Sequence, residues 1–129
     1  MVSVCFYFQV HQPYRIRDYR IFEVGENHDY FDHIKNREIM RKVGNKCYLP
    51  ANKVLLDLIK RHPEFKISFS FSGVFLEQAE EYYPEVLESF KKLVDTGNVE
   101  ILDETYHHSL AFLYSKDEFR KQVEMHNKA

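Results

Sequence analysis

Three short segments of alternating polarity, each followed by a helical pattern, constrain the fold most. The first runs to His11, before Pro13, with apolar residues on one face of an expected strand: Val2, Val4, Phe6, Phe8 and Val10. Residues 66–72 alternate in the same way, with Ser68, Ser70 and Ser72 on one face, and residues 99–102 form a short third segment. Strands separated by helices favour a parallel sheet, because parallel neighbours need a crossover connection.

Helix signals fill the intervals between these strands. We expect a short helix from Asn36 to Val43, with Asn36 as its N-cap and Gly44 as its stop. A longer helix should begin near Pro50 and end before Pro63. Residues 14–35 are polar, aromatic and irregular, which predicts a long ordered connection.

Two further helical patterns follow the second and third strands. Pro84 should break the first of them, and Gly97 is placed for a left-handed C-cap. Ser115 with Glu118 predicts a capping box for the last helix, with Phe119 and Val123 facing inward.

The strands are apolar on one face only, which favours the wall of an α/β barrel over an open doubly wound sheet. A closed barrel usually takes about 200 residues or more, and this chain has 129. We therefore expect residues 1–129 to be the first three strand-helix units, the N-terminal part of a single catalytic barrel domain truncated at its C-terminus. Functional residues of such barrels lie at the carboxyl ends of the strands.

Charge and composition exclude several classes of function. The net charge of −2 disfavours nucleic acid as the main partner. No segment approaches the roughly 20 apolar residues of a membrane span. Cys5 and Cys47 form neither a disulfide scaffold nor a zinc ribbon, so a cytoplasmic location is expected. Glycine-rich phosphate loops and Gly-x-Ser-x-Gly elbows are also absent from the sequence.

Candidate binding residues follow the first and third strands. His11 and Gln12 each offer a donor and an acceptor, which suits sugar hydroxyl groups. Glu100 lies between apolar neighbours, so its carboxylate should point to the polar face, where a ligand or a cation would offset its burial. We expect His11, Ser72 and Glu100 to share one rim of the sheet.

A second polar group follows the third strand and comprises Asp103, Glu104, His107 and His108. Histidine and carboxylate ligands bind zinc, but adjacent histidines in an extended chain do not easily face one ion. We expect neither a metal nor a cofactor. The aromatic pairs Tyr30–Phe31 and Tyr82–Tyr83 could stack on sugar rings, although core packing is the more common use of such pairs.

Several motifs together resemble the N-terminal part of glycoside hydrolase family 57. The segments His11-Gln12-Pro13 and Gly97-Asn98-Val99-Glu100-Ile101-Leu102 are similar to the first two signature regions of this family. Three further segments are similar to its amylase-like branch: residues 47–52, residues 70–77, and residues 104–110. The similar segments occur in the family's order along nearly the whole chain.

The resemblance implies an incomplete (β/α)7 barrel that cleaves or transfers α-glucosidic bonds with retention. His11 and Glu100 match substrate-binding residues of the family, and Gln12, Glu104 and His108 extend this set. The family's catalytic pair, a nucleophilic Glu and an acid/base Asp, is expected beyond Ala129, so this chain alone should be inactive. The implied partner is an α-glucan polysaccharide or oligosaccharide, together with the missing C-terminal part of the barrel.

Two alternatives stay open from the sequence. A metal-dependent polysaccharide deacetylase has a related barrel and needs an Asp and two His ligands at the strand ends, where Asp103 and His107 are candidates. A non-catalytic carbohydrate-binding remnant would keep the polar rim without a reaction.

Overall fold

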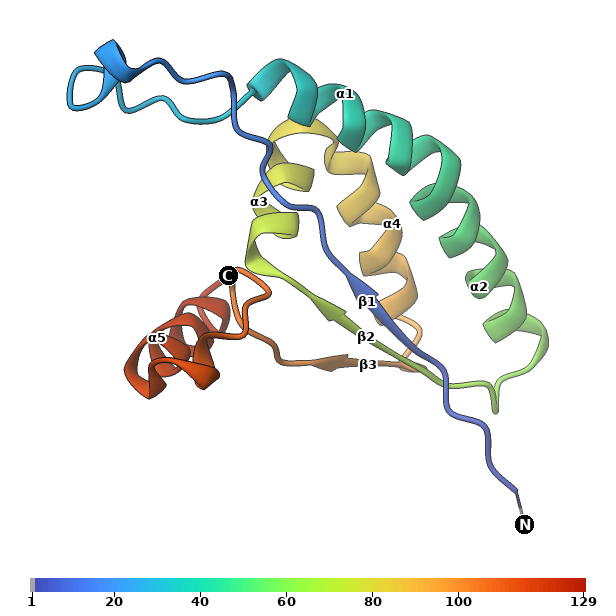
Figure 1. Ribbon diagram of the computed structural model, residues 1–129. Helices are drawn as coiled ribbons and strands as arrows, with labels where there is room; N and C mark the ends of the chain where they lie inside the picture. The colour runs from blue at the N-terminus through green and yellow to red at the C-terminus, as the bar shows by residue number, and fades with distance from the viewer. Residues whose placement is uncertain (1) are drawn as a thin grey trace.

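A computed structural model describes residues 2–129 and contains a three-stranded parallel sheet in the order β1-β2-β3 (Figure 1). The strands are β1 (Tyr7–Val10), β2 (Ile67–Phe71) and β3 (Val99–Leu102). Phe8 lies opposite Phe69, and Phe69 opposite Ile101, so the three apolar faces coincide. The predicted α/β class and parallel sheet are confirmed.

Helical crossovers connect the strands. Between β1 and β2 the chain forms α1 (His33–Val43), a π-helical turn η2 (Gly44–Tyr48) and α2 (Leu49–Arg61). Between β2 and β3 it forms α3 (Gly73–Tyr82) and α4 (Pro84–Val94), divided at Pro84 as expected. The helix α5 (Lys116–His126) follows β3, and short 3-10 helices occur at η1 (Ile21–Glu23) and η3 (Ala111–Leu113).

An aromatic cluster forms the core between the sheet and the helices α1–α4. The ring of Phe90 on α4 lies 4.9 Å from Phe71 and 5.5 Å from Phe69. Phe75 on α3 is fully buried and lies 6.1 Å from Phe90. These helices lie on one side of the sheet, whereas α5 lies apart from them beyond β3 (Figure 1). The other face of the sheet is therefore left for polar side chains.

The first strand is shorter than predicted. It begins at Tyr7, and Val2 and Val4 are 93% and 75% exposed. The partner strand β2 begins at Ile67, so the chain before Phe6 has no neighbour with which to form ladder hydrogen bonds. Alternation alone does not make a strand without a partner.

Gly44 does not end a helix. It adopts a right-handed helical conformation with φ −53°, and the chain continues through η2 into α2. A Cβ atom at Gly44 would lie 2.7 Å from the Tyr83 ring and 2.9 Å from Val86. Close packing, rather than a turn, therefore requires the glycine. Gly97, with φ +75°, has the left-handed conformation that was predicted.

Two further expectations about helix residues are wrong. Asp32, not Asn36, caps α1 and accepts a 2.9 Å hydrogen bond from the backbone of Lys35. In α5, Ser115 is the N-cap as predicted, but Phe119 is 36% exposed and Gln122 is the buried residue. Gln122 faces inward because the β3–α5 loop presents a polar group, the Ser109 hydroxyl, at 2.7 Å.

Candidate functional site

Side chains of the polar sheet face form successive rows across the strands. One row, near the strand beginnings, contains Tyr7, Ser68 and Glu100, and the next contains Gln9, Ser70 and Leu102. Beyond the carboxyl ends lie His11, Ser72 and Glu104, which we call the carboxyl-end row. It combines an imidazole, a hydroxyl and a carboxylate.

A short hydrogen bond links the ends of β1 and β2. His11 Nδ1 lies 2.7 Å from the hydroxyl oxygen of Ser72, which is fully buried. The same hydroxyl oxygen accepts a hydrogen bond from the Phe75 backbone at 3.3 Å and so caps α3. Burial, followed by the charge of His108, lowers the pKa of His11. A neutral imidazole at this place can donate or accept a hydrogen bond.

The site has two halves: the His11–Ser72 pair, and a group of hydrogen bonds around Glu104. Its Oε2 atom accepts hydrogen bonds from Gln9 Nε2 at 2.8 Å and from the Ser70 hydroxyl at 3.3 Å. Its Oε1 atom is buried and has no hydrogen-bond partner among residues 2–129. A buried carboxylate oxygen without a partner is costly, so this atom is suited to accept a hydrogen bond from a ligand.

His108 connects the two halves. Its ring lies 4.6 Å from the His11 ring, and its Nδ1 atom accepts a 3.0 Å hydrogen bond from Gln9 Nε2. The backbone of His108 is left-handed, with φ +53°, a conformation that is uncommon for residues other than glycine. Strained backbone of this kind is concentrated at functional sites.

Gln12 follows His11 and is held by hydrogen bonds to three other residues. Its side-chain amide donates to the Tyr48 hydroxyl at 3.1 Å and accepts from Arg15 Nη2 at 2.9 Å. Its main-chain carbonyl accepts a 2.6 Å hydrogen bond from the buried side chain of Gln78. These contacts fix the chain where it leaves β1.

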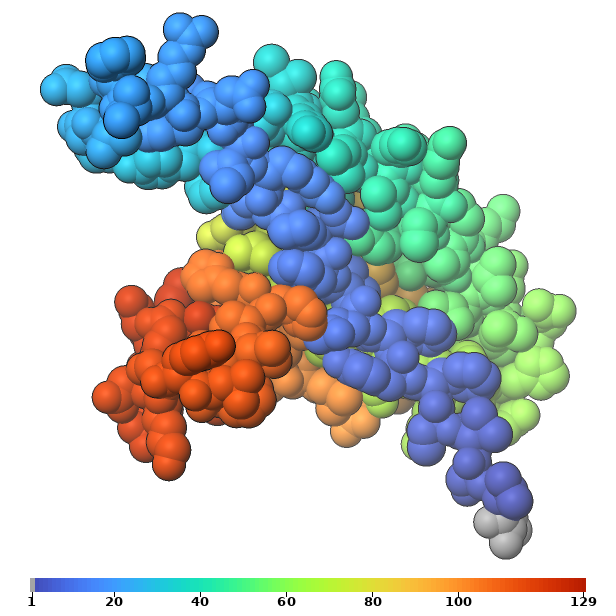
Figure 2. All heavy atoms as spheres, viewed as in Figure 1, coloured from blue at the N-terminus to red at the C-terminus, as the bar shows by residue number. Residues whose placement is uncertain are grey.

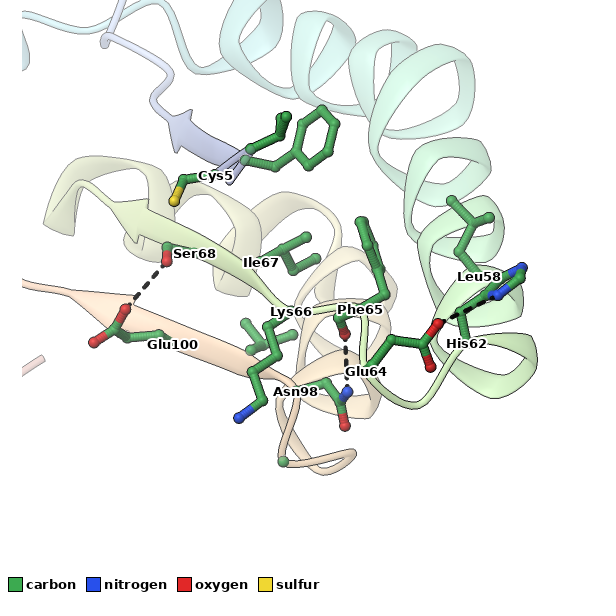
Figure 3. Close-up of a pocket in the computed structure, with 14 residues that line it drawn as sticks. Cys5, Leu58, His62, Glu64, Phe65, Lys66, Ile67, Ser68, Asn98 and Glu100 are labelled. Atoms are coloured by element: carbon green, nitrogen blue, oxygen red, sulfur yellow. Dashed lines mark hydrogen bonds and ion pairs between the residues drawn. The ribbon is translucent and has the colours of Figure 1, made fainter. Parts of the chain in front are cut away.

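Glu100 is not part of the carboxyl-end row, so the prediction that it shares a rim with His11 and Ser72 is wrong. It lies on the same face but near the beginning of β3, where the Ser68 hydroxyl donates a 3.2 Å hydrogen bond to its Oε2 atom (Figure 3). Glu104, which follows the strand by two residues, takes the expected place beside His11. The difference arises because residue 100 is only the second residue of β3.

The four residues considered as metal ligands are spread apart. Glu104 and His108 belong to the site, His107 faces a separate cavity, and Asp103 lies 4.0 Å from His126. Within residues 2–129, no three His, Cys, Asp or Glu side chains are grouped as they would be around a metal ion. None of the helices in the described part of the chain is long and apolar enough to span a membrane.

Gln9 is a side chain of the candidate site that the sequence analysis did not single out. It bonds to both Glu104 and His108, and it shares the polar phase of the first strand with His11. That shared phase is a signal that could have identified it. Together with His11, Glu104 and His108, it forms a hydrogen-bonding surface that can bind a polyhydroxylated ligand.

Comparison with known proteins identifies the family of the chain. The family described as glycosyl hydrolase family 57 matches residues 5–129. A Methanocaldococcus jannaschii protein named "Putative alpha-amylase" is 46% identical over 131 residues, which cover 97% of this chain and 27% of that protein. The 4-alpha-glucanotransferase of Thermococcus litoralis is 26% identical over 87 residues, covering 67% of this chain and 13% of that protein.

A solved structure shares the fold. The crystal structure of the Thermococcus litoralis 4-alpha-glucanotransferase superposes with a TM-score of 0.66 and 23% sequence identity. The superposition covers 96% of this chain and 16% of that structure. The chain thus spans at most about a quarter of the length of these relatives. Because the family match extends over nearly all of its residues, the chain belongs to glycosyl hydrolase family 57.

Proposed function

We propose that this chain is the N-terminal part of an incomplete (β/α)7 barrel that acts with retention on α-glucans, as a hydrolase or a transglycosylase. The observation that carries this proposal is the buried, unpartnered Oε1 atom of Glu104 beside His11 in a chain of this family. Sugar hydroxyl groups can donate a hydrogen bond to such an oxygen. His11, Glu104 and His108 would bind a glucose unit, with Gln12 holding the chain behind them.

The catalytic pair would come from elsewhere in the longer protein. A retaining mechanism needs two carboxyl groups about 5 to 5.5 Å apart. Glu100 and Glu104, the carboxylates of the polar face, accept hydrogen bonds from different residues of β2, Ser68 and Ser70 respectively. The two carboxylates thus lie in different rows, and we assign the nucleophile and the acid/base to other residues. Glu100 would instead bind substrate at a deeper row.

Binding of maltoheptaose to the 129-residue chain, measured by titration calorimetry, tests the proposal. Glu104→Gln should weaken binding roughly 10-fold, because a hydrogen bond to a charged acceptor is lost. His62→Ala is the matched control: it also replaces an ionisable residue, but it lies at the opposite end of the sheet and is exposed. Equal affinity of wild type and Glu104→Gln, or no binding by wild type, would contradict the proposal.

Hydrolysis provides a separate test. The chain should release no reducing sugar from soluble starch. Release that is abolished by Glu100→Gln or Glu104→Gln would place a catalytic carboxylate within these residues. The comparisons give no support to a deacetylase or to a non-catalytic remnant.

A further inference from the structure

A second cavity lies beside the carboxyl-end row. It has a volume of about 460 Å³ and is lined by the loop after β1, the start of α3 and the loop after β3. In Figure 2 the molecule is hollowed between the lobe of residues 14–31 and the lobe that contains α5. We call the second cavity the aromatic cavity. Its lining includes the residues used in the argument below: Tyr14, Phe31, His33, Glu77 and His107, together with His11, which also belongs to the site.

Two stacked rings form one wall of the aromatic cavity. Tyr14 and Phe31 lie 4.6 Å apart with an angle of 29° between their planes. An antiparallel bridge between Ile16 and Phe31 holds the two strands of this loop together. Asn36, fully buried, bonds through its side chain to both the backbone N–H and the carbonyl of Arg15, at 2.8 and 3.3 Å. The ring pair is thus fixed before any ligand arrives, which lowers the entropic cost of binding.

A carboxylate held by two phenols forms the opposite wall. Glu77 accepts hydrogen bonds from the hydroxyl groups of Tyr14 at 3.2 Å and Tyr106 at 2.5 Å. Burial and the interaction with Glu77 raise the pKa of Tyr14 and raise that of Tyr106 to about 12, so both phenols stay protonated at neutral pH. A carboxylate has about four acceptor positions, which leaves acceptor capacity for ligand hydroxyl groups.

Two further histidines, His33 and His107, line the aromatic cavity. His33 is bonded at both ring nitrogens, to the Tyr82 hydroxyl at 2.8 Å and to Asp29 at 3.2 Å, so it serves as wall. His107 also lines the cavity, and its side chain is exposed. The cavity therefore combines two stacked aromatic rings, a carboxylate that accepts hydrogen bonds and an exposed imidazole.

We propose that the aromatic cavity binds a second glucose unit of the same α-glucan chain, packed against the Tyr14–Phe31 pair and hydrogen-bonded to Glu77 and His107. The inference rests on the proposed function, because His11 borders both this cavity and the carboxyl-end row. Its volume lies in the usual range for small-molecule sites. Sugar rings offer both an apolar face and hydroxyl edges, and these two wall types match them.

Titration calorimetry with glucose and maltoheptaose tests this second unit. Phe31→Ala should weaken binding of maltoheptaose roughly 3- to 10-fold, the usual range for loss of one ring contact, and change the affinity for glucose by less than about 2-fold. Phe31→Tyr should bind as wild type does. Phe22→Ala is the matched control, since Phe22 belongs to the same loop, is 88% exposed and does not line the cavity.

A second variant guards against loss of the loop structure in Phe31→Ala. Glu77→Gln keeps the size of an exposed side chain and should weaken maltoheptaose binding roughly 3-fold, with unchanged circular dichroism. If wild type binds maltoheptaose and both variants bind it equally well, the second unit is overturned and the proposed function stands. If wild type binds neither sugar, the proposed function itself is overturned, and this inference falls with it.

Discussion

The two ends of the sheet differ in how their polar side chains meet. At the amino ends of the strands lies the larger space, about 790 Å³, lined among others by Cys5, Lys66 and Glu100 (Figure 3). Among residues 2–129, one hydrogen bond joins strand side chains that line this space, from Ser68 to Glu100. At the carboxyl ends, side chains from all three strand regions meet in one network. Convergence of polar groups, rather than empty volume, is therefore our reason for proposing the site at the carboxyl ends.

Backbone connections explain this difference. At the amino ends, the Asn98 side chain donates to the carbonyl groups of Pro63 and Phe65, at 2.7 and 2.8 Å, and holds the two loops together. Its polar atoms are used for structure. At the carboxyl ends the Glu104 Oε1 atom keeps free hydrogen-bonding capacity.

The largest expected effect concerns the glycine at each end. A Cβ atom at Gly73 would lie 2.2 Å from the Tyr106 ring, whereas one at Gly97 would have no atom within 4 Å. Gly73→Ala should lower the free energy of unfolding by about 3 kcal/mol through overpacking. Gly97→Ala should lower it by about 1 kcal/mol, because alanine is strained at φ +75°. Urea denaturation measures both, and equal losses would mean that the carboxyl end is not tightly packed.

The next effect concerns the two carboxylates. Glu104→Gln should raise the free energy of unfolding by about 1 kcal/mol, since it removes a negative charge from a carboxylate that has a buried, unpartnered oxygen. Glu100→Gln should change it by less than about 0.5 kcal/mol, because its hydrogen bond is exposed. Thermal melts compare the two. A loss of stability in Glu104→Gln would show that its accepted hydrogen bonds outweigh the unpartnered oxygen.

The smallest effect is a pH dependence at His11. Its pKa is lowered in the folded chain, so protonation favours the unfolded state. Stability from this group is complete above the unfolded pKa of about 6.5 and declines as the pH falls through the folded value. The melting temperature of wild type should therefore fall more between pH 7.5 and 5.5 than that of His11→Gln. His62→Gln, at the other end, should retain the wild-type slope, and an identical slope in His11→Gln would disprove the assignment.

Local patterns in the sequence predicted the strand phases and the parallel order correctly. Ser68, Ser70 and Ser72 do face the polar side, and His11 does meet Ser72. The row to which each acidic residue belongs was not predictable. It depends on the register that pairs Ile67 with Val99, and contacts between segments more than thirty residues apart set that register. Glu100 was therefore expected at the rim that Glu104 occupies.

Long-range contacts also explain the other errors. Gly44 has the sequence context of a helix stop, but the Tyr83 ring and Val86, far along the chain, fill the space of its absent side chain. The loop of residues 14–35 was expected to be ordered, yet nothing local shows that Phe31 returns to stack on Tyr14. The Ile16–Phe31 bridge and the contact of Arg15 with Asn36 of α1 fix that return.

The π-helical turn between α1 and α2 fixes the rotation of α2 about its axis relative to α1. Gly44–Tyr48 closes one residue wider than an α-helical turn, and each α-helical residue rotates the chain by about 100°. Deleting a single residue here would restore a regular helix but rotate α2 relative to α1, which would turn Asn52 and Ile59 out of the core. Asn45, Lys46 and Cys47 are exposed. A surface segment that resembles a tolerant loop therefore has a fixed length.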